Sequence, residues 1–367
     1  MVTSLYVAPF VVAALISGGL TYSVIKVAQK FGWADFPSPR KVHTTPTPRL
    51  GGVAIVVAFL CLAIGYNLVS TRLNFGSAHI FMFDKKLFGA LLGILILLVI
   101  GVVDDIRGMK PWQKLIGHFL AAAMVVAFGV STNYIRLPGG LHVELTNLVY
   151  PITLFTHTYH FVVFGDLLTV FWIVLMINTM NFLDGLDGLA SGVSLIAGIA
   201  IFFLSLSLGQ PAAALLAIIF SGAVFGFLPW NFNPAKIFMG DSGSMFLGYM
   251  LGVLSVISGG KLATAFLVLG IPLLDVVWVV LRRLTHGKSP FVADRMHLHH
   301  RLLAIGFSQR QAVVILYFAA AAFGVVAVLS GTEEKIQALF WLLGIMAILI
   351  IVLLILQWRR GRTSVQE

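Results

Sequence analysis

Long runs of apolar residues divide this chain, and short polar segments separate them. A helix that crosses a membrane needs about 20 mostly apolar residues, and this pattern predicts an all-α polytopic membrane protein of about eleven transmembrane helices. The predicted spans are residues 4–25, 51–70, 87–103, 114–130, 167–183, 189–208, 212–229, 243–258, 262–281, 312–330 and 338–357.

Composition supports the membrane interpretation. Of the 367 residues, 59% are hydrophobic and only 10% are charged, with a mean hydropathy of +1.00. Soluble domains carry about 25% charged residues, so a soluble protein is excluded. The single cysteine, Cys61, cannot form an internal disulfide.

The basic residues indicate how the spans are oriented. A net charge of +10 would favour nucleic-acid binding in a soluble protein, but here the basic residues lie at the ends of apolar runs, so we expect a lipid bilayer and no nucleic acid as partner. An outside N-terminus places 18 of the 24 Lys and Arg residues on the inner side. The positive-inside rule therefore predicts this orientation, with a cytosolic C-terminus. The first run is no cleaved signal peptide, since its first charge, Lys26, follows it.

The two sides of the membrane differ in their polar content. On the outer side, apolar and polar residues alternate around Pro138-Gly-Gly between Tyr134 and Leu145, which predicts a small external β-hairpin. No repeat or second domain is evident, so residues 1–367 form one integral membrane domain. The polar residues that need a chemical explanation lie on five inner loops, at 31–50, 104–114, 178–188, 230–244 and 283–310.

Aspartates concentrate on the inner side, where eight of the ten are found. Asp104 and Asp105 end the third span, where two carboxylates repel each other and oppose the negative end of the helix dipole. That arrangement calls for a cation, and Arg107, Lys110 and Lys114 are the local candidates. The alternative is a solvated pair in a loop.

A second polar group follows the fifth span, where Asn178, Asn181, Asp184 and Asp187 recur every three residues. The first of these share one side of a helix, and the following glycines place the carboxylates on a turn. Asp and Asn oxygens suit Mg²⁺, and a Gly-rich turn that leads into a helix presents N–H groups to an anion. The alternative is a structural turn between helices.

Two further inner loops carry candidate chemistry. In Gly240-Asp241-Ser242-Gly243, the glycines let a phosphate approach closely, or the Asp-Ser pair is a simple helix N-cap. The run from Arg295 to Arg301 holds three His and two Arg, and it fits a diphosphate clamp better than zinc, because the usual zinc spacings are absent. Attraction to anionic lipid is the other alternative.

The ninth predicted span contains two unusual residues. Asp275 is an intramembrane carboxylate, which indicates either a functional group or pairing with a neighbouring helix. Pro272 predicts a kink, which would open a lateral groove for a lipid tail.

Six stretches in this order resemble the polyprenyl-phosphate N-acetylhexosamine-1-phosphate transferases, from residue 33 to about 310. They are Asp35-x-Pro-x-x-Arg40-Lys41-x-His43, Pro48-Arg-Leu-Gly-Gly52, Asp104-Asp105 with Lys114, Asn178-x-x-Asn181-x-x-Asp184-Gly-Leu-Asp187-Gly188, Asn233-Pro-Ala-Lys-Ile-Phe-Met-Gly-Asp241-Ser-Gly-Ser and His297-Leu-His299-His300-Arg301.

The resemblance implies a bacterial inner-membrane enzyme that uses Mg²⁺, or Mn²⁺ in its place. It would transfer HexNAc-1-phosphate, most simply GlcNAc-1-phosphate, from a UDP-HexNAc to undecaprenyl phosphate, release UMP and start a cell-envelope glycan. Asp241 and Asn181 would be metal ligands, and Asp104 or Asp105 the catalytic carboxylate. The implied substrate-binding residues are Asp35, Arg40, Lys41, His43, Lys114, Asn178, Asp184, Asp187, Asn233, His297, His299, His300 and Arg301.

The last motif bears on the donor. The related muramoyl-pentapeptide transferases have three consecutive histidines there, whereas this chain has His-Leu-His-His-Arg, which favours a plain HexNAc donor. We expect direct attack by the lipid phosphate, which is mostly a dianion at pH 7, over a covalent intermediate on Asp104. A multi-span transporter is the alternative function, although transporter sites lie at the bilayer midplane. An intramembrane metallohydrolase is a third hypothesis, and a homodimer stays open.

Overall fold

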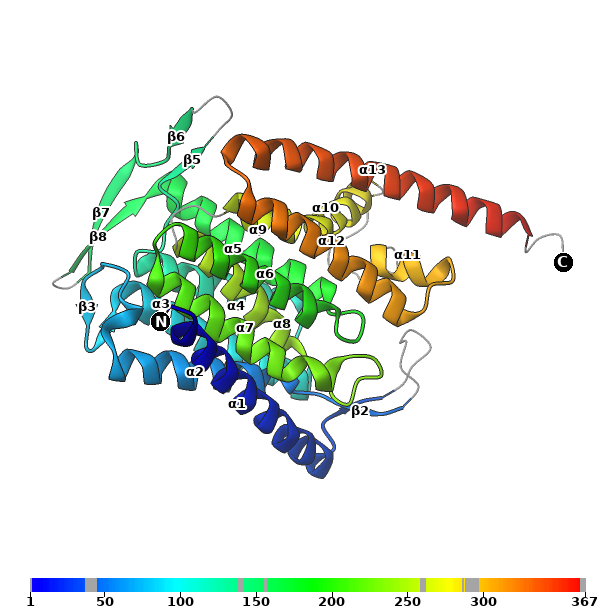
Figure 1. The fold of residues 1–367 in the computed structure, drawn as a ribbon, viewed down its shortest axis with the longest axis horizontal. Coiled ribbons are helices and arrows are strands. Elements are labelled where there is room, and N and C mark those ends of the chain that lie inside the picture. Colours follow the sequence, from blue (N-terminus) through cyan, green and yellow to red (C-terminus); the bar gives the residue numbers. More distant parts are fainter. Residues whose placement is uncertain are drawn as a thin grey trace.

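A computed structural model describes residues 2–36, 45–136, 141–154, 157–257, 262–285, 287 and 297–363. The chain is mainly helical, and the long helices run side by side along the longest axis of the molecule (Figure 1). The helices are α1 (Val2–Phe31), α2 (Gly51–Val69), α3 (Lys85–Arg107), α4 (Pro111–Ala127), α5 (Val163–Leu183), α6 (Leu189–Ser207), α7 (Pro211–Asn231), α8 (Asp241–Ile257), α9 (Leu262–Val268), α10 (Gly270–Thr285), α11 (Leu298–Ala304), α12 (Gln309–Leu329) and α13 (Thr332–Thr363).

Every predicted span coincides with a helix or, for 262–281, with the bent pair α9–α10. Among the described residues, 7 helices are long and apolar enough to cross a membrane, or 8 if the bent pair is one span. The shorter helix α8, with 17 residues, is apolar but falls below that length. The prediction of a polytopic helical protein is therefore confirmed, and the count of eleven spans stays a prediction.

Within the described part of the chain, the strands form four short antiparallel pairs. They are β1 (Ala34–Asp35) with β2 (Thr47–Pro48), β3 (His79–Ile80) with β4 (Phe83–Asp84), β5 (Tyr134–Arg136) with β6 (His142–Glu144), and β7 (Val149–Leu154) with β8 (His157–Val162). The predicted hairpin is confirmed as β5–β6, in which Ile135 pairs with Val143. The pair β7–β8 was not predicted. These hairpins lie at one end of the bundle, and β2 and α11 lie at the other (Figure 1).

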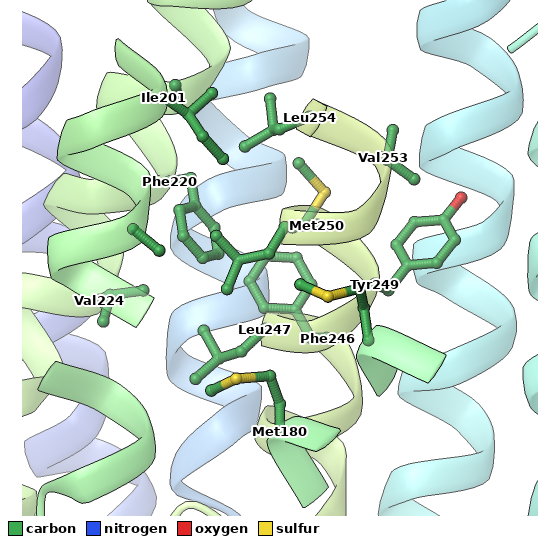
Figure 2. Packing of buried hydrophobic residues seen from close by; sticks show 14 of the residues in the cluster. Met180, Ile201, Phe220, Val224, Phe246, Leu247, Tyr249, Met250, Val253 and Leu254 are labelled. Atoms are coloured by element: carbon green, nitrogen blue, oxygen red, sulfur yellow. The ribbon is translucent and has the colours of Figure 1, made fainter. Parts of the chain in front are cut away.

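The core of the bundle surrounds α8, whose residues from Ser242 to Ile257 are all buried. Phe246, Leu247 and Met250 pack against side chains of α5, α6 and α7, among them Phe220 and Val224 (Figure 2). Lipid is as apolar as these side chains, so close contact between helices stabilises such a bundle more than water exclusion does. The burial of α8 therefore fixes its first residue, Asp241, firmly in space.

Small residues allow the neighbouring helices to approach the start of α8. A Cβ atom on Gly52 of α2 would lie 2.0 Å from the backbone nitrogen of Gly243. A Cβ on Gly101 of α3 would lie 2.4 Å from the Cα of Ser242. Both distances are too short for any side chain, so backbone packs directly on backbone here. These contacts bring the ends of three helices together at one place.

The bend between α9 and α10 does not lie at Pro272, where the sequence predicts a kink. The helix breaks between α9 and α10, at Leu269, and the two halves meet at 81°. Pro272 lies in the first turn of α10, where its missing N–H is tolerated. The proline therefore begins a new helix and does not bend a continuous one.

Candidate functional site

Three carboxylates meet where α3 ends and α8 begins. One oxygen each from Asp104, Asp105 and Asp241 lies within 4.8 Å of the others. Within the described ranges, this is the one group of three or more acidic, His or Cys side chains close enough to hold a metal ion. Among the described residues, the histidines of the His297–Arg301 segment form no such group, so the structure gives no support to the zinc alternative.

Asp105 holds the first turn of α8. Its carboxylate accepts hydrogen bonds from the backbone nitrogens of Asp241 (2.8 Å) and Ser242 (3.1 Å), and from the Ser242 hydroxyl (2.7 Å). Gly240 lies against the same carboxylate, where a Cβ would be 2.5 Å from its oxygens. The cap of α8 thus comes from a different helix. The alternative that Asp241 serves only as the N-cap is wrong, and its carboxylate is available to the site.

Lys114 and Asn181 contact the carboxylate of Asp241 from two sides. The Lys114 ammonium donates to Asp241 at 2.7 Å and to Asp104 at 3.4 Å. The Asn181 amide donates to Asp241 at 3.1 Å and to the Ser244 hydroxyl at 3.0 Å. Of the three cations predicted to compensate Asp104 and Asp105, Lys114 is the one that forms ion pairs in the cluster.

The turn after α5 joins two loops of the site. Helix α5 ends at Leu183, so Asp184 and Asp187 lie on the predicted turn. Asp187 accepts hydrogen bonds from the Asn233 amide (2.9 Å) and from the backbone nitrogen of Ala235 (3.1 Å). Burial and the nearby carboxylates Asp241 and Asp105 raise the pKa of Asp184 well above its ordinary value. Asp187 and Asn233 therefore hold the loop before α8 in position.

The histidine segment is anchored by Asp275 of α10. The Asp275 carboxylate lies 2.9 Å from His297 Nδ1 and accepts from the backbone nitrogen of Leu298 at 2.9 Å. Of the two interpretations of Asp275, a functional group or a partner for a neighbouring element, the structure therefore shows the second. His299 is buried against Gly185, and burial together with His300 and His297 lowers its pKa well below the ordinary value.

Two cavities of opposite charge flank the acid cluster, and they share Asp184, Gly185 and His300 as a common wall. We call the first the acidic cavity. It measures about 320 Å³, and its charged lining is Asp35, Arg49, Asp105, Asp184, Asp187 and Asp241. The second, the basic cavity, measures about 300 Å³, and its ionisable lining is Lys114, His118, Asp184, Arg283, His297, His299 and His300.

Most predicted site residues thus reach one place. Asp35 lines the acidic cavity and forms an ion pair with Arg49. Asn178 lines the basic cavity, and Arg301 is buried nearby in α11. The predicted residues Arg40, Lys41 and His43 lie outside the described residues.

Sequence reasoning missed several residues that line the cavities, namely Arg49, His118, Phe238, Arg283 and Gln309. His118 carried one usable signal, because it follows Lys114 by four residues and so shares its helix face. Arg49 belonged to a matching motif but received no role there. Phe238 likewise belonged to the motif that contains Asp241 without a role, and Arg283 and Gln309 reach the site only through tertiary packing.

Known proteins resemble this chain over most of its length. The family model of glycosyl transferase family 4 matches residues 87–259. The decaprenyl-phosphate N-acetylglucosaminephosphotransferase of Mycobacterium tuberculosis is 34% identical, covering 83% of this chain and 77% of the relative. The probable undecaprenyl-phosphate N-acetylglucosaminyl 1-phosphate transferase of Bacillus subtilis is 32% identical, covering 88% and 84%.

A third relative, the undecaprenyl-phosphate alpha-N-acetylglucosaminyl 1-phosphate transferase of Escherichia coli K12, is 30% identical and covers 83% of this chain and 78% of its own length. These matches confirm the resemblance drawn from the motifs and give no support to a transporter. The chain therefore belongs to the polyprenyl-phosphate N-acetylglucosamine-1-phosphate transferases of glycosyl transferase family 4.

Proposed function

We propose that this protein transfers GlcNAc-1-phosphate from UDP-GlcNAc to a polyprenyl phosphate, most simply undecaprenyl phosphate, and releases UMP. The activities for which the relatives are named support this chemistry. The observation that carries the proposal is the cluster of Asp104, Asp241, Lys114 and Asn181 between two cavities of opposite charge. Such a site brings a nucleotide-bound diphosphate and a separate phosphate together.

The acid cluster suits Mg²⁺, with Mn²⁺ as a substitute. With all groups ionised, three carboxylates and the Lys114 ammonium leave a formal charge of −2, which one divalent cation neutralises. Hard oxygen donors are the ligands that Mg²⁺ prefers. Asp241 and the side-chain oxygen of Asn181 would hold the ion, Asp104 would lie beside it as the catalytic carboxylate, and Asp105 is committed to capping α8. When bound, the ion would neutralise charge on the diphosphate and on the departing UMP.

The donor fits the acidic cavity. An unchelated anion is repelled by its carboxylates, whereas a diphosphate that reaches the cluster with its cation is not. Asp184 and Asp187 would accept hydrogen bonds from hydroxyl or N–H groups of the nucleotide. His300 lines both cavities, so it can reach the diphosphate from the common wall. His297 is held by Asp275, and with His299 and Arg301 it would support that wall.

The reaction is a single displacement at phosphorus. An oxygen of the acceptor phosphate attacks the phosphorus that carries the sugar, and the bond from that phosphorus to the UMP oxygen breaks. The acceptor has a second pKa near 6, so it is mostly a dianion at pH 7 and already nucleophilic. Asp104 would accept any remaining proton from that oxygen, and Lys114 would orient the charges of the reacting groups.

The membrane setting completes the proposal. Eleven spans, an outside N-terminus and a cytosolic C-terminus would place the five polar loops in the bacterial cytosol, where a UDP-sugar is available. Residues 1–367 would then form one domain in the inner membrane. The product would start a cell-envelope glycan.

A detergent assay tests this function. Purified protein with UDP-GlcNAc should release UMP only when undecaprenyl phosphate and Mg²⁺ are both present, and EDTA should stop the release. Asp241→Asn should abolish it, because an amide is a weaker Mg²⁺ ligand, while Glu144→Gln on exposed β6 should not change it. UMP release that proceeds without any lipid phosphate, or an active Asp241→Asn at low Mg²⁺, would contradict the proposal.

A further inference from the structure

His118 is a buried histidine that the proposed chemistry does not use. It lies on α4 four residues after Lys114, so both side chains share a face of the helix. It is one turn, about 6 Å, further from the start of that helix. The side chain is only 3% exposed, and it lines the basic cavity.

The hydrogen bonds around His118 define which ring nitrogen carries the proton. The Asn178 amide nitrogen donates to the Val174 carbonyl at 2.7 Å and lies 3.4 Å from His118 Nδ1. An amide nitrogen only donates, so Nδ1 is the acceptor and the proton of the neutral ring resides on Nε2. His118 Nε2 is buried and has no hydrogen-bond partner among the described residues. A buried N–H donor therefore lines this cavity without an acceptor.

The rest of the basic cavity shows which acceptor would fit. Its lining combines Lys114 with amides and other nitrogen-bearing side chains, and Asp184 is its one carboxylate among the described residues. A group with several anionic oxygens suits such a lining. Lys114 also contacts Asp104 and Asp241, so an anion in this cavity lies beside the acid cluster. Phe182 and Leu115 add apolar surface for a hydrocarbon chain attached to that anion.

We propose that the basic cavity binds the phosphate monoester of the lipid acceptor, and that the Nε2–H group of His118 donates a hydrogen bond to one of its oxygens. This inference rests on the proposed function and adds a binding residue to it. The two substrates would then occupy separate cavities, with the carboxylates and Lys114 between them. A free phosphate has the same oxygens, so the test must separate the headgroup from the lipid chain.

Kinetics on two variants test the role of His118. His118→Met keeps the volume and removes the donor, while His118→Gln places an amide N–H near the former Nε2. We expect His118→Met to raise the KM for undecaprenyl phosphate about 10- to 100-fold, the range for a hydrogen bond to a charged group. The KM for UDP-GlcNAc should change less than about twofold, and His118→Gln should recover most of the loss. His142→Met on exposed β6 is the matched control.

Thermal unfolding gives a second measurement. Undecaprenyl phosphate should raise the Tm of the wild type and of His118→Gln but not of His118→Met, and inorganic phosphate should do so weakly in the same order. The substrate-free Tm of His118→Met should be equal or higher, since a buried unpaired donor is removed. A rise only in the KM for UDP-GlcNAc, or a lower substrate-free Tm with unchanged KM values, would overturn the proposal. An inactive wild type would instead contradict the proposed function.

Discussion

Asp104 and Asp105 are neighbours in the sequence but bind different parts of the molecule. Asp105 accepts three hydrogen bonds from the start of α8, whereas Asp104 accepts one from the backbone nitrogen of Met109 (2.7 Å) and faces Lys114. Each residue along an α-helix is rotated by about 100° from the one before it, so two successive side chains point in different directions and contact different partners. The pair therefore combines one structural carboxylate with one that faces the reacting groups.

Substitutions should separate these two roles. Asp105→Ala leaves two backbone N–H groups at the start of α8 without their acceptor, so we expect a loss of roughly 1–3 kcal/mol in the free energy of unfolding. Asp104→Asn keeps an acceptor for Met109, so its Tm should stay near the wild-type value while UMP release falls strongly. Differential scanning fluorimetry and the UMP assay measure both effects. Equal loss of stability in the two variants would contradict this division.

The pH profile of Asp104→Asn also bears on the mechanism. If Asp104 only removes the last proton from the acceptor, activity should partly recover as pH rises from about 6 to 9, because the phosphate then ionises unaided. A nucleophile would not be rescued at any pH. A labelled phosphosugar trapped on Asp104 without lipid would show the covalent route instead.

Buried His299 should make the protein less stable in acid. Burial and the neighbouring His300 and His297 hold its pKa well below the ordinary histidine value of 6.5. A depressed pKa means that the unfolded chain binds the proton more readily than the folded protein. Stability is therefore complete above pH 6.5 and falls as the pH drops below it. We expect Tm to decrease between pH 7 and 5, and His299→Gln should reduce that slope. An unchanged slope in the variant would show that other groups cause it.

At the scale of elements, the start of α8 organises the site. Gly52 of α2 and Gly101 of α3 pack directly on its backbone, and Asp105 of α3 supplies its cap. Asp241, the first residue of α8, is thereby held next to Lys114 of α4 and Asn181 of α5. Four helices determine the position of one carboxylate, so errors in their packing should reduce activity.

Two glycines on α2 provide a matched pair for that idea. Gly52→Ala would place a Cβ 2.0 Å from the backbone of Gly243, which must move, so we expect a loss of at least about 1–3 kcal/mol and reduced UMP release. Gly65→Ala meets nothing within 4 Å and should leave both properties unchanged or slightly improved. Thermal unfolding and the UMP assay on both variants measure the difference. Equal behaviour of the two would show that the α2–α8 contact is not essential.

The elements that the sequence predicts well are those with a strong local pattern. Apolar runs mark the long helices, and Pro138-Gly-Gly marks the hairpin β5–β6. The segments of β7 and β8 are rich in β-branched and aromatic residues, but no Gly or Asn turn motif lies between them, so the local pattern does not mark them as a hairpin. The break at Leu269 and the short helix α11 depend on packing and on the cap from Asp275, which lies 23 residues before Leu298. Long-range contacts of this kind produce no periodic pattern in the sequence.

For the whole molecule and its site, too, local sequence patterns predict which segments matter, whereas long-range contacts have to be seen in the structure. The five inner loops are visible in the sequence because acids and histidines are rare in so apolar a chain. Which of these residues touch is decided by the bundle, as Asp105 with Ser242 and Lys114 with Asp241 show. The described parts of these loops gather at the end of the bundle that holds β2 and α11, opposite the hairpins β5–β8 (Figure 1). The predicted orientation would place this end of the bundle on the cytosolic side.

Cysteine labelling in intact cells tests that orientation. In a Cys61→Ala background, we expect Asn147→Cys, which lies between β6 and β7, to react with a membrane-impermeant maleimide. Thr285→Cys, at the end of α10, should react only after the membrane is opened. Both positions are exposed, so a difference in labelling reports the side of the membrane and not burial. Thr132 would be unsuitable because it is buried.

Labelling at Thr285 reports the side of the membrane on which the whole site lies, and not only the position of one loop. Thr285 follows Arg283, which lines the basic cavity, so its side of the membrane is the side of the whole site. Because a UDP-sugar is a cytosolic metabolite, a site on the outer face would have no donor. Labelling of Thr285→Cys in sealed cells would therefore contradict the predicted topology and the proposed donor together, even if the family assignment stood.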